Sequence, residues 1–243
     1  MNIGIIGSGE MGACLASGLN KLGHRVSIAN SRGPASLAKI AQATGAEPVE
    51  VEQAIKNKEV IVISIPSKNI PDLPKALFSE LKKDVVVIDT TNYYPQLRDG
   101  ILPELEQSWI DSLWVQQQLN VPIVKVFNSI LATSLQVLGR PKGHAERIAL
   151  AISGDSAHGK TIASELVDQL GFDPVDSGAI SQSWKLQPGS PVYCRDIGVL
   201  EMSNRLESLN GDWSVLSKVI LPKRQADEAL MGLNYPAYLE SLI

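Results

Sequence analysis

The sequence predicts an α/β protein in which a doubly wound, mainly parallel sheet carries helices on both faces. Short β-branched runs recur along the chain, and each is followed by a segment with a helical pattern. The runs Val60–Pro66 and Val85–Ile88 are almost continuously apolar, as in parallel strands that are buried on both faces. We expect this sheet to occupy residues 1–130. A smaller mixed α/β and helical part, residues 131–243, is expected to pack against it and to hold extra strands and helices.

The expected elements follow in chain order. A strand at Ile3–Ile6 leads through a glycine turn into a helix with Leu15, Leu19 and Leu22 on one face, and Arg25–Ala29 is the next strand. The first part continues with a helix from Pro34 to about Thr44, ended by Gly45, and then a short strand or turn and a helix over Val49–Asn57. Strand runs follow at Val60–Pro66 and Val85–Asp89, separated by a helix to about Lys82. A helix at Gln107–Leu119 and a strand at Pro122–Phe127 end this part. The second part has a strand at Arg147–Ser153, a helix at Ala157–Leu170 closed by Gly171, a strand at Phe172–Asp176 and mainly helix from Tyr193 onward.

The turn after the first strand carries the most informative motif. Residues 7–12 read G-S-G-E-M-G, which is the G-x-G-x-x-G pattern placed directly between a strand and a helix. Gly7 permits the sharp turn, Gly9 lets the backbone approach a pyrophosphate, and Gly12 lets the helix pack closely on the strand. The helix start offers unpaired N–H groups and a positive dipole end to phosphates. This pattern predicts a dinucleotide site formed by Gly7, Ser8, Gly9, Glu10, Met11 and Gly12.

The end of the second strand indicates which dinucleotide is bound. An NAD site of this type has an Asp or Glu about 20 residues after the glycines to hold the ribose hydroxyls, whereas this chain reads Asn30-Ser31-Arg32. A hydroxyl and a guanidinium can donate to a 2′-phosphate that a carboxylate would repel. The competing interpretation is that Arg32 is a solvated charge and Ser31 a helix cap. We therefore expect NADP(H) to be the cofactor in preference to NAD(H).

Small polar residues follow several of the expected strands. In a doubly wound sheet ligands lie beyond the carboxyl ends of the strands, so these residues suit a ribose or a carboxamide. Each of them alone is also compatible with an ordinary strand-end turn. The residues predicted to join the cofactor site are Ile65, Pro66 and Ser67 after the fourth strand, Asn92 after the fifth, and Asn128 and Ala132 after the sixth.

Composition excludes several classes of partner. The net charge is −4 with acids and bases interspersed, so no basic face is expected for nucleic acid. The apolar runs are of strand length, and the chain enters its first strand at once, which argues against a membrane span or a leader peptide. Cys14 and Cys194 have no metal or redox spacing, and the three histidines fit surface or capping roles. We expect a cytoplasmic protein without a metal site, and the sequence singles out no catalytic acid or base.

Further motifs indicate which family of dinucleotide-binding proteins this chain resembles. They are Gly23-His24-Arg25-Val26, Asn30-Ser31-Arg32-Gly33-Pro34, Ile65-Pro66, Val124-Lys125-Val126-Phe127-Asn128, Ser153-Gly154-Asp155 and the segment Leu170–Gly178. With the Met11-Gly12 end of the glycine loop, they resemble the deazaflavin (factor 420)-dependent NADP oxidoreductase family over about residues 1–190. The resemblance implies a Rossmann domain that holds NADPH through Ser8–Met11, with Ser31 and Arg32 at the 2′-phosphate. It also implies hydride transfer to a flavin- or deazaflavin-type ring, a small-molecule redox acceptor stacked on the nicotinamide.

The C-terminal part departs from the compact archaeal reductases of that family. The loop Trp184–Tyr193 combines aromatic and polar residues, and we hypothesise that it forms a wall of the acceptor pocket, with Trp184 or Tyr193 as the stacking face. The competing interpretation is a structural loop that caps the sheet edge. The apolar tail Leu233–Ile243 suggests a homodimer, although a tail folded back on its own subunit fits equally well.

Two other functions fit part of the pattern. The first is a β-hydroxyacid dehydrogenase or imine reductase, whose glycine loop also ends in Met-Gly. Such enzymes rely on a long all-helical second domain with a catalytic lysine, whereas strands are expected here after Asn128. The second is a non-catalytic NADP(H)-binding sensor, which would keep the nucleotide site without an acceptor pocket.

Overall fold

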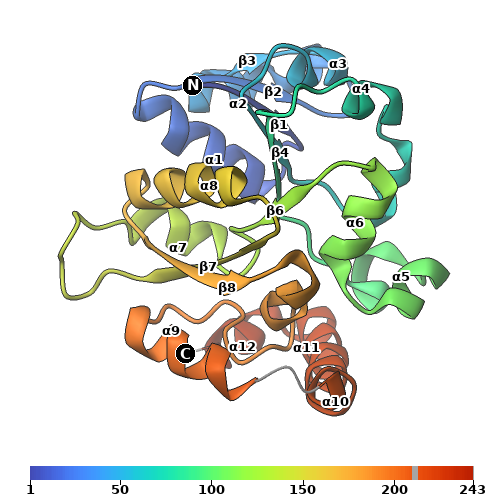
Figure 1. The fold of residues 1–243 in the computed structure, drawn as a ribbon, viewed down its shortest axis with the longest axis vertical. Coiled ribbons are helices and arrows are strands. Elements are labelled where there is room, and N and C mark those ends of the chain that lie inside the picture. The colour runs from blue at the N-terminus through green and yellow to red at the C-terminus, as the bar shows by residue number, and fades with distance from the viewer. Residues whose placement is uncertain (210–212, 243) are drawn as a thin grey trace.

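One sheet of eight strands organises the protein in the computed structural model, which describes residues 1–209 and 213–242. The strand order is β3-β2-β1-β4-β5-β6-β7-β8, and the sheet runs through the middle of the molecule (Figure 1). The strands are β1 (Asn2–Ile6), β2 (Arg25–Ala29), β3 (Glu47–Pro48), β4 (Val60–Ile63), β5 (Val86–Asp89), β6 (Ile123–Lys125), β7 (Ala149–Gly154) and β8 (Asp173–Gly178). Neighbouring strands are parallel except β6 and β7. The predicted α/β, doubly wound, mainly parallel fold is confirmed.

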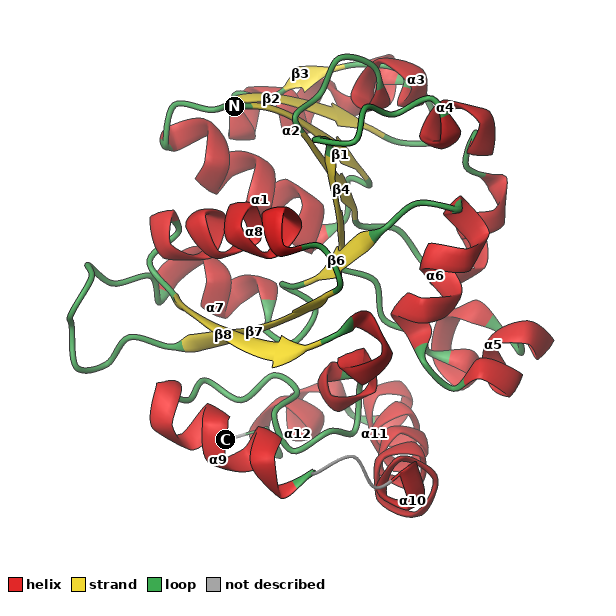
Figure 2. Ribbon diagram, in the orientation of Figure 1, coloured by secondary structure: helices red, strands yellow, loops and turns green. Residues whose placement is uncertain are grey.

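Helices cover both faces of this sheet (Figure 2). They are α1 (Glu10–Lys21), α2 (Ala38–Thr44), α3 (Val51–Ile55), α4 (Lys75–Ser79), α5 (Pro103–Ser108), α6 (Asp111–Leu119), α7 (Ala132–Val137), α8 (Ala157–Gln169), α9 (Val199–Ser208), α10 (Trp213–Val215), α11 (Leu221–Leu233) and α12 (Tyr235–Glu240). Short turns of helix occur at η1 (Pro34–Leu37), η2 (Ser67–Asp72), η3 (Pro95–Asp99), η4 (Ile180–Leu186) and η5 (Leu216–Ile220). Among the helices described, none is long and apolar enough to cross a membrane.

The alternation of side chains along each strand builds two cores. In β4, Val60 and Val62 pack into the core beneath α1, α7 and α8, whereas Ile61 and Ile63 pack into the core beneath α3, α4 and α6. Because successive side chains of a strand point to opposite faces, a continuous β-branched run serves both cores at once. This explains why the central strands have no polar side.

Two predicted helices are interrupted. The helix expected up to about Lys82 is instead η2 followed by the short α4, because Pro71 and Pro74 cannot donate the backbone hydrogen bonds of a continuous helix. The helix expected at Gln107–Leu119 divides between α5 and α6, since Trp109 lies in the left-handed region with φ 55°. Both interruptions follow strands that border the cleft described below.

The C-terminal helices form a separate layer beside β7 and β8, at the red end of the ribbon (Figure 1). Tyr238 and Leu242 are buried in a cluster with Tyr193, so part of the apolar tail packs on its own subunit. Leu233 and Tyr235 remain 87% and 50% exposed, and Ile243, also included in that prediction, lies outside the described residues. Residues from both predicted parts share one core, and the division at residue 130 stays a prediction.

Candidate functional site

A cleft of about 920 Å³ opens at the carboxyl ends of β1, β2, β4 and β5. The strand order reverses between β1 and β4, and such a switch point is where doubly wound sheets bind ligands. The predicted residues that line the cleft are Gly7, Ser8, Gly9, Glu10, Met11, Asn30, Ser31, Arg32, Ile65, Pro66 and Asn92. The structure thus brings together the glycine loop and the ends of three further strands.

The glycine loop has the geometry that a phosphate-binding turn requires. Gly7 has φ +122°, and a Cβ there would lie 2.0 Å from the carbonyl oxygen of Ser64. A Cβ on Gly9 would meet no protein atom within 4 Å, because Gly9 faces the open cleft. Gly12 does not line the cleft, and its Cβ would come 2.2 Å from the carbonyl oxygen of Gly7, so this glycine serves the packing of α1 under the loop. The free space at Gly9 fits a dinucleotide pyrophosphate next to the start of α1.

The end of β2 is held in place through Asn30. Its side chain donates to the hydroxyl oxygens of Ser8 and Ser36, at 3.1 and 3.0 Å, and its Oδ1 accepts the backbone N–H of Arg32 at 2.9 Å. This ties the β2 turn to the glycine loop. Among the described residues Arg32 has no ion-pair partner, and its exposed guanidinium borders the cleft. A charge in this position can pair with an added phosphate group.

Three other predicted residues do not line the cleft. The Ser67 hydroxyl is buried and donates to the carbonyl oxygen of Asn92 at 3.2 Å. Asn128 is also buried, and its Nδ2 donates to Oδ1 of Asn92 at 3.1 Å. Ala132 begins α7, where its carbonyl oxygen accepts the Cys14 thiol. Ser67 and Asn128 therefore support Asn92, which does line the cleft.

Residues outside the predicted cofactor set complete the lining. They are Ile6 at the end of β1, Val51, Glu52, Ser64, Asn69, Asp72, Leu73 and Pro74 on the β3 and β4 sides, and Thr90, Thr91, Tyr94 and Arg98 on the β5 side. Tyr94 follows the fifth strand closely, so its position was a usable signal. Arg98 gave no such signal in the sequence, because it reaches the cleft through the η3 turn.

Arg98 and Tyr94 form an end wall of the cleft. The guanidinium lies 5.3 Å from the centre of the Tyr94 ring, and it pairs with Asp99, whose Oδ2 is 2.9 Å away. The Asp99 carboxylate also accepts the backbone N–H of Tyr94 at 2.9 Å. From α11, Glu228 accepts the backbone N–H groups of Gln96 and Leu97 at 2.8 and 3.0 Å. The C-terminal layer thereby fixes the turn that carries this wall.

A buried ion pair lies under the same end of the sheet. Lys125 Nζ is 3.0 Å from Oδ2 of Asp89, and both side chains are inaccessible to solvent. The other contacts of the Asp89 carboxylate come from the Ser112 hydroxyl and the backbone N–H of Thr91. Nearby, burial raises the pKa of Asp111 to about 6, against the opposing attraction of Arg224 and Lys125. These charges hold the ends of β5 and β6 together.

The hypothesis that Trp184 or Tyr193 supplies a stacking face is wrong. Trp184 is 1% exposed and packs into the core with Leu216 and Ile220, while Tyr193 is buried against the C-terminal helices. Both aromatic rings fill cores, so neither presents a flat surface to a ligand. Tyr193 still reaches the site indirectly, since its hydroxyl accepts from Asn92 at 3.1 Å.

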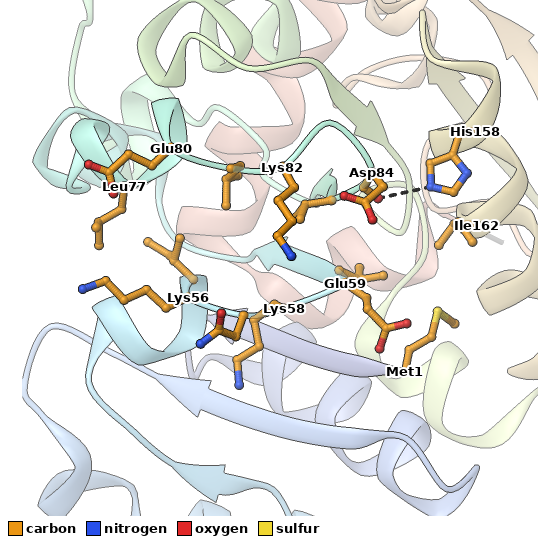
Figure 3. A pocket seen from close by; sticks show the side chains of 15 residues that line it. Met1, Lys56, Lys58, Glu59, Leu77, Glu80, Lys82, Asp84, His158 and Ile162 are labelled. Atoms are coloured by element: carbon orange, nitrogen blue, oxygen red, sulfur yellow. Dashed lines mark hydrogen bonds between the residues drawn. The ribbon is translucent and has the colours of Figure 1, made fainter.

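A second cavity, of about 590 Å³, lies at the opposite, amino-terminal end of β1, β4 and β5 (Figure 3). Its rim mixes lysines with carboxylates, among them Lys58, Lys82, Glu59 and Asp84, and the His158 ring hydrogen-bonds the Asp84 carbonyl oxygen at 3.2 Å. None of the predicted cofactor residues lines this cavity. The described residues also contain no group of three metal-ligating side chains.

Comparison with protein families agrees with the motifs. Residues 2–93, which contain β1 to β5 and most of the cleft, match the model of the family described as NADP oxidoreductase coenzyme F420-dependent. The resemblance to this family is confirmed. The F420-dependent family consists of NADP-linked oxidoreductases, and the match ends before α5.

Two curated proteins are related in sequence. YjhV of Escherichia coli (strain K12) is 45% identical over 56 residues, which cover 23% of this chain and 41% of that protein. Metalloreductase STEAP3 of Rattus norvegicus is 25% identical over 186 residues, which cover 76% of this chain and 35% of that protein. The chain therefore spans less than half the length of either relative.

Two solved structures resemble most of the fold. The hypothetical protein SMa0349 from Sinorhizobium meliloti has a TM-score of 0.68 and 26% identity, covering 82% of this chain and 96% of that one. A proposed F420-dependent NADP reductase from Arthrobacter sp. FB24 has a TM-score of 0.61 and 20% identity, covering 90% and 96%. At that identity the second likeness shows the fold alone.

Proposed function

We propose that this protein is an NADP(H)-dependent oxidoreductase that transfers hydride between NADPH and a flavin- or deazaflavin-type acceptor. The observation that carries the proposal is the cleft in which the glycine loop, Arg32, which has no ion-pair partner among the described residues, and the Asn92–Tyr94 wall all meet. Arg32 replaces the acid that would hold an unphosphorylated ribose, which favours NADP(H). The matched family, which is F420-dependent and NADP-linked, supports the same assignment.

The cleft suits an extended dinucleotide. The loop Gly7–Gly9 and the start of α1 would take the pyrophosphate, and Ser31 and Arg32 the 2′-phosphate. NADPH supplies the hydride from its nicotinamide ring when it is bound. Asn92 and Tyr94 lie at the β5 side of the cleft, where they would border the nicotinamide and the acceptor. Hydride transfer between two rings depends mainly on their proximity and orientation, which this wall would help to fix.

This geometry does not support the alternative of a β-hydroxyacid dehydrogenase or imine reductase, which would need a catalytic lysine. After Asn128 the chain returns to the sheet through β7 and β8, and Lys185 lies 5.9 Å from the Trp184 ring instead of in the cleft. The sensor alternative would keep the nucleotide site without an acceptor pocket and would show no turnover, so an activity measurement separates it from our proposal.

The decisive experiment follows NADPH oxidation with free flavins, a deazaflavin, quinones and imines as acceptors. We expect turnover with a flavin or the deazaflavin, and loss of that turnover in Arg32→Ala at low NADPH concentration. Turnover with imines alone would favour the imine-reductase alternative. Tight NADPH binding without oxidation by any acceptor would favour the sensor.

We also propose a cytoplasmic homodimer. Both thiols, Cys14 and Cys194, are free, as is usual in a reducing compartment. The exposed Leu233 and Tyr235 lie two positions apart in the chain at the junction of α11 and α12, where an apolar surface would favour a symmetric contact.

A further inference from the structure

A pair of tyrosine hydroxyls lies at the β5 end of the cleft. Tyr94 lines the cleft, and its hydroxyl oxygen is 2.5 Å from that of the buried Tyr193. The pair is not an isolated contact. Asn92, which also lines the cleft, donates to the Tyr193 hydroxyl at 3.1 Å, and Asn128 lies behind Asn92.

The donors in this chain can be assigned in order. The carbonyl oxygen of Asn128 can only accept, so the amide nitrogen of Asn92, 3.0 Å away, must face it. The other hydrogen of that nitrogen is then directed at the Tyr193 hydroxyl oxygen. Asn128 Nδ2 fixes the same orientation by donating to the Asn92 side-chain oxygen.

The order continues to the cleft. Because the Tyr193 oxygen accepts from Asn92, its own hydrogen is free to be donated to Tyr94, 2.5 Å away. The thiol of Cys194 is the competing acceptor, but sulfur accepts hydrogen bonds weakly. The Tyr94 oxygen then accepts from Tyr193, and its hydrogen has no acceptor among the described residues. This leaves one polarised hydroxyl donor on a residue that lines the cleft.

We propose that the Tyr94 hydroxyl is the donor that stabilises the reduced acceptor, and that Tyr193 and Asn92 are positioning residues for it. The inference rests on the proposed function. The hydride of NADPH adds to one end of the conjugated C=N system of the acceptor ring, at nitrogen in a flavin or at carbon in a deazaflavin. The π bond there breaks, and its electron pair moves through the conjugated ring to another ring nitrogen or a carbonyl oxygen. Tyr94 donates its hydrogen bond to that atom, which takes up one proton from the solvent, while NADPH becomes NADP⁺. The acceptor class is therefore one whose reduction adds a hydride and a proton.

The surroundings keep Tyr94 in its donating form. Burial raises the pKa of its hydroxyl well above the ordinary value, even though Tyr193 and Arg98 oppose this shift. A neutral donor prepositioned at the place where negative charge develops lowers a barrier without having to lose its proton first. The Arg98 guanidinium, stacked 5.3 Å from the ring centre, further favours charge build-up beside the ring.

The test compares Tyr94→Phe with Tyr93→Phe. Tyr93 is adjacent and fully buried, but its hydroxyl bonds to Gly100 and Leu102, away from the cleft. With the acceptor that the wild type reduces, Tyr94→Phe should lower kcat about 100-fold or more, as expected for loss of one prepositioned donor. Tyr193→Phe should give a smaller loss. Tyr93→Phe should reduce the melting temperature and leave kcat near the wild-type value.

Two further measurements separate this role from a structural one. The affinity for NADPH, measured by fluorescence without turnover, should be unchanged in Tyr94→Phe. The rate of the wild type should be lower in D₂O than in H₂O, and Tyr94→Phe should lose that difference. An active wild type with an equally active Tyr94→Phe overturns this inference and leaves the proposed function standing. A wild type that binds NADPH but reduces no acceptor overturns both.

Discussion

Gly9 separates nucleotide binding from folding more cleanly than any other position in the loop. Its backbone is extended, with φ −71° and ψ −177°, so alanine adopts it without strain. A Cβ there would meet no protein atom within 4 Å. Two effects on stability oppose each other: alanine restricts the unfolded chain, which stabilises by about 0.4–1 kcal/mol, and it is a poorer helix N-cap than glycine, which costs about 0.5–1 kcal/mol. Gly9→Ala should therefore change the free energy of unfolding by less than about 0.5 kcal/mol.

The affinity for NADPH, unlike the stability, should change strongly in Gly9→Ala. The added methyl group would occupy the space that the pyrophosphate needs, and we expect NADPH affinity to fall at least about tenfold, or 1.4 kcal/mol. Isothermal titration calorimetry and urea unfolding measure the two quantities on the same sample. Gly12→Ala is the matched control, since its Cβ would lie 2.2 Å from the Gly7 carbonyl oxygen and should cost about 1–3 kcal/mol of stability. Normal NADPH binding by Gly9→Ala would show that the loop is only a turn.

Three further predictions test the supporting structure. Lys125→Met should lower the free energy of unfolding by about 3–5 kcal/mol, because it leaves the buried Asp89 carboxylate without its cation. Adding Asp89→Asn to this variant should recover part of that free energy, as measured by urea unfolding. If the double variant recovers none of it, the two residues do not stabilise the fold as a pair. Burial raises the pKa of Asp111 from 3.8 in the unfolded chain to about 6, so its contribution to stability is greatest at low pH and is lost as pH rises from about 4 through 6. Asp111→Asn should therefore gain stability over the wild type at pH 8 but not at pH 4, and equal differences at both values would refute this origin. Truncation after Met231 should convert a dimer to a monomer in sedimentation, and a monomeric full-length chain would rule out the proposed dimer.

The sequence predicted the sheet well because the relevant signals are local. β-Branched runs specify strands buried on both faces, and Gly45, with φ +73°, ends α2 where the pattern placed it. The glycine loop is equally local, since six adjacent residues define both the turn and the helix start. Interruptions such as Trp109 were missed, because nothing in the residue type alone favours its left-handed conformation.

The end wall of the cleft could not be predicted in the same way. Arg98 reaches it only because Asp99 is buried beneath the turn and Glu228, 130 residues away in the chain, caps the neighbouring N–H groups. The aromatic residues of Trp184–Tyr193 were misassigned for a related reason: composition does not reveal whether a ring faces a ligand or a core. Here the C-terminal helices cover both rings.

The measurement that tests the central claim most directly is the pair of dissociation constants for NADPH and NADH, in the wild type and in Arg32→Ala. Because the exposed Arg32 has no ion-pair partner within the described chain and borders the cleft, its pairing with a 2′-phosphate should favour NADPH by at least about tenfold, or 1.4 kcal/mol. Arg32→Ala should remove this preference while leaving NADH affinity nearly unchanged. Equal affinities for the two nucleotides in the wild type would contradict the account.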